Sequence, residues 1–276
     1  MHPTLFHIFG LEIRSFGLMA ATGLLLAFWL VQSRAKKSGE DPHIISDIIF
    51  FGMLGALFGA RLLYVVRNWE AEFANDLWKI VRINEGGIVF QGGFIGGLLV
   101  AWFMCRKKKV DFVKALDIVT PCLALGHAMG RIGCFLNGCC YGGLCSSGLS
   151  VQFPRESLPY ADQLRHGKID FTAVHSLPVH PTQLYSFAAN LLICLILVYV
   201  TVKIKVKGQL FSLYLMLYGV WRLGIEFLRD DQDRHLGLSV AQYIAIAQFL
   251  IGLFLWVYFL KSKKQNMEVE DASTTK

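Results

Sequence analysis

The stretch Ile45–Val66 reads ISDIIFFGMLGALFGARLLYVV. It is almost wholly apolar over a length that crosses a bilayer core, which takes about 20 residues of α-helix. Further stretches of this kind are approximately Phe16–Gln32, Ile88–Cys105, Phe112–Leu136, Gln183–Val202, Leu210–Leu228 and Val240–Leu260. The sequence therefore predicts an all-α integral membrane protein with about seven transmembrane helices.

The composition supports this class. The chain of 276 residues is 54% hydrophobic and only 17% charged, whereas soluble domains carry about 25% charged residues. The net charge of +7 indicates membrane topology and attraction to anionic lipids, rather than nucleic-acid binding. We expect a single polytopic domain over residues 1–264 and a disordered cytoplasmic tail over 265–276.

Basic residues in short loops predict the orientation, because such loops stay on the cytoplasmic side. Every second connection between the predicted helices contains more closely spaced lysines and arginines than the connections between them. These residues are Arg34, Lys36 and Lys37; Arg106, Lys107, Lys108 and Lys109; Lys203, Lys205 and Lys207; Lys261, Lys263 and Lys264. We expect these connections to be cytoplasmic, with the N-terminus outside and the C-terminus inside. The polar segment near residues 139–181 is then a small extracytoplasmic loop region.

With this orientation, the polar residues of the predicted helices share the depth of the outer leaflet. They are Arg61, Gln91, Arg131, His180, Gln183, Tyr218, Arg222 and Glu226. Charges inside a membrane are costly and therefore indicate function, and guanidinium groups suit phosphate oxygens. The alternative is that the arginines only reach toward the interface or pair with Glu226.

Glycines accompany these polar residues, and two interpretations of them remain. Gly92 and Gly93 directly follow Gln91. Small residues allow helices to pack closely, and glycine also lets the backbone approach a ligand.

Four cysteines gather where the fourth predicted helix ends: Cys134, Cys139, Cys140 and Cys145. An external position permits disulfides, and a nearby arginine and histidine could activate a thiol. The C-x4-C-C-x4-C spacing is not a common zinc pattern. The sequence favours a structural or disulfide role, and we predict neither a metal nor a cofactor.

Several segments, in order along nearly the whole chain, resemble one family. They are GARLLYV at Gly59–Val65, QGG at Gln91–Gly93, GRIGCFLNG at Gly130–Gly138, HPTQLY at His180–Tyr185, YGVWRLGIEFLR at Tyr218–Arg229 and LSVAQ at Leu238–Gln242. Together they are similar to the signatures of the prolipoprotein diacylglyceryl transferases.

The resemblance implies a reaction and a location. That family moves the diacylglyceryl group of phosphatidylglycerol onto the lipobox cysteine of a prolipoprotein, forming a thioether and releasing glycerol phosphate. This is the first step of bacterial lipoprotein maturation. The expected location is the cytoplasmic (inner) membrane, with the active site toward the outer leaflet, and the expected partners are the lipid and the prolipoprotein signal peptide.

The resemblance also implies residue roles. Arg131 would bind the lipid headgroup, Arg222 would stabilise the leaving phosphate, and Tyr218 would orient it. Asn137 would be a supporting donor, and Glu226 would position Arg222. The remaining residues expected to bind substrate are Arg61, Gln91, Gly92, Gly93, His180 and Gln183.

The chain departs from the family pattern at the expected base. Gln91 stands where the family has histidine, and glutamine is not a base at neutral pH. The usual asparagine and glutamate of the arginine signature are Cys134 and Cys139, and a common tyrosine is Phe16. A free thiol has a pKa of about 8.5, so the acceptor cysteine must lose a proton.

Three sources of that deprotonation remain open. His127 lies one helical turn from Arg131 on the same face, although a core histidine with a satisfied hydrogen bond is the competing interpretation. His180 is a second candidate base. The third possibility is that no residue acts as a base and the arginines alone lower the pKa of the substrate thiol.

Two other functions are consistent with the missing histidine. The chain could be a lipid-binding or transport protein that has lost catalysis, or a transferase that uses another thiol acceptor. Transfer of label from phosphatidylglycerol to a lipobox peptide would distinguish these functions.

Overall fold

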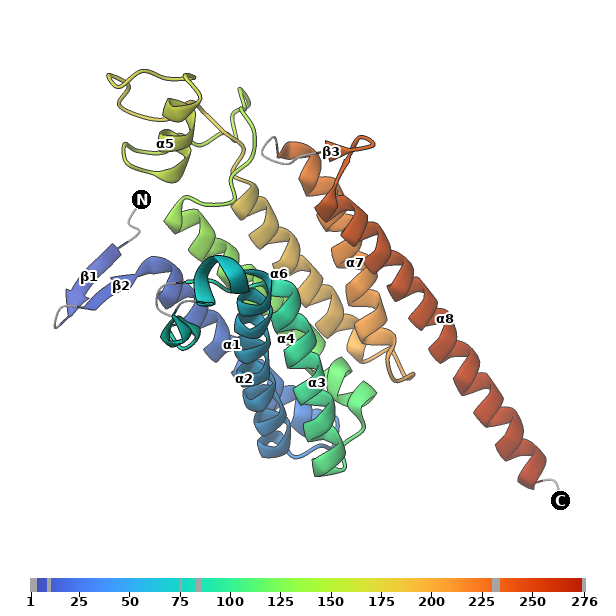
Figure 1. The fold of residues 1–276 in the computed structure, drawn as a ribbon. Helices are drawn as coiled ribbons and strands as arrows, with labels where there is room; N and C mark the ends of the chain where they lie inside the picture. Colours follow the sequence, from blue (N-terminus) through green and yellow to red (C-terminus); the bar gives the residue numbers. More distant parts are fainter. Residues whose placement is uncertain (1–3, 9–10, 75, 83–85, 230–233, 275–276) are drawn as a thin grey trace. The chain divides into compact units, whose positions relative to one another are not determined.

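The computed structural model describes residues 4–8, 11–74, 76–82, 86–229 and 234–274. Eight α-helices dominate these residues (Figure 1): α1 (Ser15–Lys37), α2 (Pro42–Arg67), α3 (Phe90–Lys108), α4 (Phe112–Asn137), α5 (Leu158–Arg165), α6 (Thr182–Thr201), α7 (Gln209–Ile225) and α8 (Val240–Thr274). Two small antiparallel hairpins accompany them, β1 (Thr4–Ile8) with β2 (Leu11–Arg14) and β3 (Arg234–His235) with β4 (Leu238–Ser239). Short helical turns cover Trp69–Phe73, Leu77–Ile80 and Glu226–Leu228.

The predicted class of all-α integral membrane protein is confirmed. Six segments of the described residues are long and apolar enough to cross a membrane: Ser15–Lys37, Pro42–Arg67, Phe112–Asn137, Thr182–Thr201, Gln209–Leu228 and Val240–Lys263. Helix α3 matches the remaining predicted span, but its glycines and its basic C-terminal end lower its hydropathy. The seventh crossing and the orientation stay predictions.

Contacts divide the chain into two compact units. One unit comprises Leu30–Ile118, and the other comprises Met1–Trp29 together with Val119–Lys276. We call them the α2–α3 unit and the α4–α7 unit, and each is described by itself. The single transferase domain over residues 1–264 stays a prediction.

In the α2–α3 unit, glycines allow α2 and α3 to pack closely. A Cβ added to Gly96 would lie 3.0 Å from the Cα of Gly59, and one added to Gly92 would lie 2.6 Å from the Cβ of Leu63. The start of α2 is fixed by Asp41, whose carboxylate accepts the backbone N–H of His43 at 2.8 Å. This is the ordinary N-cap arrangement, and Pro42 in the first turn suits it.

In the α4–α7 unit, α7 packs against both α6 and α8. A Cβ on Gly219 would lie 2.9 Å from the carbonyl oxygen of Ala245, so this glycine lets α8 approach α7. The segment between α4 and α6 is an ordered cap around α5. Its centre is Phe153, which is fully buried and whose N–H donates to the Ser176 hydroxyl at 2.8 Å.

The C-terminal segment continues the last helix. Helix α8 runs through Thr274, and residues 275 and 276 lie outside the described residues. The disordered cytoplasmic tail expected over 265–276 stays a prediction.

Candidate active site

Helices α4 and α7 bring three of the predicted catalytic residues together. The Arg131 Nε–H donates to His127 Nε2 over 3.3 Å, one turn along α4. The ring of His127 lies 5.2 Å from the ring of Tyr218 on α7, and Tyr214 stacks on Tyr218 at 5.8 Å. Because arginine cannot accept a hydrogen bond, His127 uses the lone pair of Nε2 in this contact.

The fourth predicted catalytic residue, Arg222, is held by a buried carboxylate. Arg222 Nη1 lies 2.6 Å from Glu226 Oε2, one turn along the same helix, and the Glu226 side chain is only 1% exposed. The Arg222 side chain is 22% exposed, so part of it remains accessible beside the buried carboxylate. Tyr218 lies one turn before Arg222 on α7 and its ring is beside that of His127, so the part of α7 that carries Arg222 lies beside the part of α4 that carries Arg131.

A capping box at the start of α8 fixes the other oxygen of Glu226. The Ser239 hydroxyl donates to Glu226 Oε1 at 3.0 Å. Ser239 also accepts the backbone N–H of Gln242 at 3.2 Å, and Gln242 Oε1 accepts the backbone N–H of Ser239 at 2.9 Å. The serine and the glutamine three residues later therefore satisfy each other's backbone donors. The carboxylate that holds Arg222 is thus anchored to two helices.

The end of α4 is a Schellman motif that returns the chain toward the helix. Gly138 has φ 74°, its N–H donates to the Phe135 carbonyl, and the Cys139 N–H donates to the Cys134 carbonyl, both at 3.1 Å. This is the standard way in which a glycine satisfies the last carbonyls of a helix. The motif places Cys139 directly beside Cys134, with its thiol 3.7 Å from the Cys134 carbonyl oxygen.

The first residues of α6 hold the turn that follows. Thr182 donates from its hydroxyl to the Cys140 carbonyl at 2.7 Å, and Gln183 donates from Nε2 to the Cys139 carbonyl at 2.8 Å. Gln183 is fully buried. Cys140 itself has φ 60°, a left-handed conformation that is uncommon for a residue with a side chain.

Three sulfur atoms meet at this turn. The thiols of Cys134, Cys139 and Cys140 all lie within 4.8 Å of one another, and all three are free. Cys145 is outside this group and contacts the Ser147 hydroxyl at 3.0 Å. Hydrogen bonds from Cys134 and Cys139 lower the pKa of the Cys140 thiol, and the charges of Arg131 and Arg229 lower it further.

The other predicted residues of this unit surround the turn. Asn137 is the last residue of α4, directly before the turn at Gly138. The His180 N–H donates to the Gly143 carbonyl at 3.0 Å, and its carbonyl accepts the Gly142 N–H at 2.9 Å. The ring nitrogen Nδ1 of His180 is buried and has no hydrogen-bond partner among the described residues.

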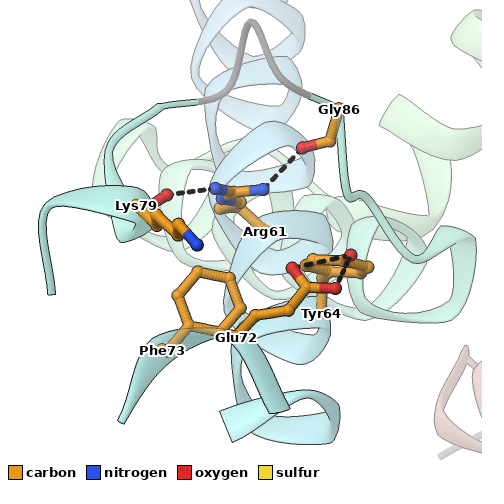
Figure 2. A pocket seen from close by; sticks show the side chains of 6 residues that line it. All are labelled: Arg61, Tyr64, Glu72, Phe73, Lys79 and Gly86. Carbon is orange, nitrogen blue, oxygen red and sulfur yellow. Dashed lines mark hydrogen bonds between the residues drawn. The ribbon is translucent and has the colours of Figure 1, made fainter. Parts of the chain in front are cut away.

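Arg61, in the α2–α3 unit, is bound on every side by backbone carbonyls. Figure 2 shows its guanidinium between Lys79 and Gly86, beside the rings of Phe73 and Tyr64. The carbonyls that accept from Arg61 belong to Ile80 at 3.0 Å, Gly86 at 2.6 Å, Gly87 at 2.9 Å, Arg82 at 3.3 Å and Lys79. These bonds use all five N–H donors of the guanidinium. The substrate-binding role of Arg61 stays a prediction.

The remaining predicted residues begin α3 in the same unit. Gln91 is exposed, whereas Gly92 is buried against Gly59 and Leu63 of α2. A Cβ on Gly93 would lie 3.2 Å from the carbonyl oxygen of Ala56. Both glycines therefore serve helix packing, and their predicted contact with substrate stays a prediction.

Sequence reasoning missed Thr182 as the residue that holds Cys140, and Ser239 with Gln242 as the support of Glu226. The second omission had a signal in the sequence. A serine followed three residues later by glutamine, directly before an apolar run, is the pattern of a capping box.

The apolar helices and the arginines of α4 and α7 define a multi-pass membrane protein with a charged site among its helices. The chain belongs to the prolipoprotein diacylglyceryl transferase family, whose family model matches residues 3–258.

Curated relatives of this chain bear the name phosphatidylglycerol–prolipoprotein diacylglyceryl transferase. The protein of Clostridium tetani (strain Massachusetts / E88) is 36% identical over 257 residues, covering 93% of this chain and 97% of the relative. The protein of Clostridium novyi (strain NT) is 34% identical and covers 96% of this chain and 98% of the relative. That of Finegoldia magna is 33% identical and covers 98% and 100%.

Proposed function

We propose that this chain transfers the diacylglyceryl group of phosphatidylglycerol to the cysteine thiol of a prolipoprotein. The main structural support is the meeting of α4 and α7 at His127. Its Nε2 accepts from Arg131 on α4, and its ring lies 5.2 Å from the ring of Tyr218, one turn before Arg222 on α7. Guanidinium groups suit the phosphate of a phosphodiester substrate, and family membership supports the same reaction.

The proposed chemistry is a displacement at carbon. The acceptor thiolate attacks the glycerol carbon that is bonded to the phosphate oxygen, a C–S bond forms, and the C–O bond breaks. The electron pair of the broken bond stays on glycerol phosphate, which leaves as an anion. Fixed donors aimed at the oxygen where this charge develops lower the barrier. We assign this task to Arg222, which Glu226 and Ser239 hold in place.

The other residues are assigned roles around this step. Arg131 binds the phosphate of the headgroup, and Tyr218, beside His127, orients it. Asn137 begins the turn after α4, and His180 and Gln183 hold it through hydrogen bonds. The predicted substrate contacts of Gln91, Gly92 and Gly93 stay predictions. For Arg61 we propose a structural role instead, because backbone carbonyls already take its donors.

The proposed location is the bacterial cytoplasmic membrane, with the site facing the outer leaflet. The support is the distribution of basic residues, since the denser set of loops would be cytoplasmic. In that orientation phosphatidylglycerol enters sideways from the outer leaflet. Cysteine-accessibility labelling of single residues in the segment 139–181 tests this orientation in intact cells.

The activity is tested with labelled phosphatidylglycerol and a lipobox peptide in membranes that contain this chain. We expect label to appear on the peptide, and replacement of the peptide cysteine by serine to abolish it. Arg131→Ala should abolish transfer, whereas Arg165→Ala, at an exposed arginine of α5, should retain it. Label that stays only in lipid would instead indicate a lipid-binding or transport protein, and would overturn the proposal.

A further inference from the structure

We propose that Cys134, Cys139 and Cys140 bind one Zn²⁺ ion as thiolates, and that its fourth coordination position takes the acceptor thiol of the prolipoprotein. The inference deepens the proposed transferase function and rests on it. It departs from the sequence prediction of no metal, which was based on an uncommon cysteine spacing. The observation that carries it is the meeting of three sulfur atoms, all within 4.8 Å of one another, at the end of the helix that carries the predicted phosphate-binding Arg131.

The geometry of the three thiols fits zinc. Zinc–sulfur bonds are about 2.3 Å long, so sulfur atoms in a tetrahedral site lie roughly 3.8 Å apart. The three sulfur atoms, all within 4.8 Å of one another, therefore lie within about 1 Å of the spacing that a tetrahedral site requires. The Schellman turn at Gly138 places Cys139 beside Cys134. The cysteines can therefore meet although their spacing in the sequence is unusual for zinc.

The backbone around the cluster is fixed before any ion binds. Thr182 and Gln183 hold the carbonyls of Cys140 and Cys139. Cys140 keeps a left-handed conformation at φ 60°, which costs free energy and persists only where the surroundings impose it. Such constraint is expected of a site in which side-chain direction matters.

The surrounding charge suits an anionic metal centre. Three thiolates around Zn²⁺ carry a net charge of −1, and a fourth thiolate makes it −2. Arg131 lies three residues before Cys134 on α4, and Arg229 directly follows Leu228, whose carbonyl accepts the Gly143 N–H at 2.8 Å, so two positive charges lie near the cluster. The arginines therefore offset the charge that the bound acceptor thiolate would add.

The site leaves one position open. Among the described residues, the group of potential ligands contains three members only, and Cys145 contacts Ser147 instead. Three protein ligands with a free fourth position are typical of catalytic zinc, whereas structural zinc has four.

An open coordination position explains how the acceptor thiol can lose its proton although Gln91 replaces the histidine of the family. A thiol that coordinates zinc is deprotonated, and its proton passes to water when the acceptor binds. The bound thiolate then attacks the glycerol carbon, the C–S bond forms and glycerol phosphate leaves with the electron pair. The thioether product is neutral and a weaker ligand, so it dissociates. No base is needed at Gln91.

Metal content of the full-length protein, purified in detergent without chelator, is the first test. We expect about one zinc per chain by mass spectrometry, and at least a tenfold lower content in Cys134→Ser and Cys140→Ser. Cys145→Ser is the matched control and should retain the zinc. Thermal unfolding of each variant shows whether it is folded. A native chain without zinc, or one in which two of these three thiols react only after reduction and therefore form a disulfide, overturns the proposal.

Cobalt substitution in the unmutated protein tests the open position without any variant. Co²⁺ should give thiolate-to-metal charge-transfer absorption, which increases when a lipobox peptide binds and does not change with the serine peptide. Chelator treatment should reduce label transfer at least tenfold, and Zn²⁺ but not Mg²⁺ should restore it. Full transfer by metal-free protein would reject the zinc site and leave the transferase function standing. Zinc binding without any transfer would reject the transferase function and, with it, the acceptor role of the open position.

Discussion

Arg61 and Arg222 are both arginines of apolar helices, but their surroundings differ in kind. Arg61 is 7% exposed and gives all its donors to backbone carbonyls of the segment 79–87. Arg222 is 22% exposed and is held by one carboxylate, which Ser239 holds in turn. A guanidinium saturated by backbone carbonyls stabilises a loop, whereas one held from a single side by a carboxylate still has donors for a ligand.

The charge of a membrane arginine does not by itself reveal its role. Both arginines satisfy the rule that intramembrane charges indicate function. The acceptors distinguish them, because carbonyls are fixed by the backbone and cannot be exchanged for a substrate without unfolding the loop. We expect substitutions at Arg222 to affect chemistry and substitutions at Arg61 to affect stability.

The largest effect is expected for Arg222→Ala. Removal of one preorganised donor to a developing negative charge typically costs a factor of about 10²–10³ in kcat. We expect at least that loss in label transfer from phosphatidylglycerol to peptide. Thermal unfolding in detergent should confirm that the variant is folded, and Arg165→Ala is the control. A folded Arg222→Ala protein with native kcat would remove the distinction between the two arginines.

A smaller effect is expected for Glu226→Gln. The amide preserves the shape of the side chain and a hydrogen bond with Ser239, but it loses the ion pair that fixes Arg222. Because Glu226 touches no reacting atom, it is a positioning residue. We expect kcat to fall by roughly tenfold, because the Arg222 guanidinium is no longer held in place by a carboxylate. KM should change little. An equal fall in kcat for Ser239→Ala and Glu226→Gln would indicate that Ser239 fixes the carboxylate.

Arg61→Lys should act on stability instead. Lysine keeps the charge but offers three donors in place of five, so carbonyls of the segment 79–87 lose their partners. Each unsatisfied buried group costs about 1–3 kcal/mol, and a loss of roughly 2–4 kcal/mol would lower Tm by about 5–10 °C. Arg67→Lys, at an exposed arginine of the same helix, is the matched control. A native Tm together with a raised KM would assign Arg61 to substrate binding.

Much of the fold could be predicted because apolar length alone determines which segments can cross a membrane. The predicted stretch Ile45–Val66 became Pro42–Arg67, the extra turn being fixed by the cap at Asp41. Helix α3 is the weakest case, since its glycines serve packing against α2 and reduce its hydropathy.

The site could be predicted only where its contacts are local. The i, i+4 spacing of Arg222 and Glu226, and of His127 and Arg131, correctly predicted contacts along one helix. The carbonyl ligands of Arg61 come from a loop about 20 residues away in sequence, and its path has no local pattern. The cysteine cluster likewise forms because α4 ends just before Gly138, and the spacing of the cysteines does not predict where the helix ends.

The smallest effect is expected for His127→Gln, at the residue that contacts Arg131. A glutamine oxygen can accept from the Arg131 Nε–H as His127 Nε2 does, but it cannot take a proton from a thiol. If zinc deprotonates the acceptor, kcat should fall by less than about fivefold, and the pH dependence of transfer should keep its shape. A general base typically contributes a factor of about 10²–10⁴, so a loss of that size, with a changed pH profile, would make His127 the base. His127→Ala removes both functions, and comparison of the two variants separates the loss of the Arg131 contact from the loss of a base.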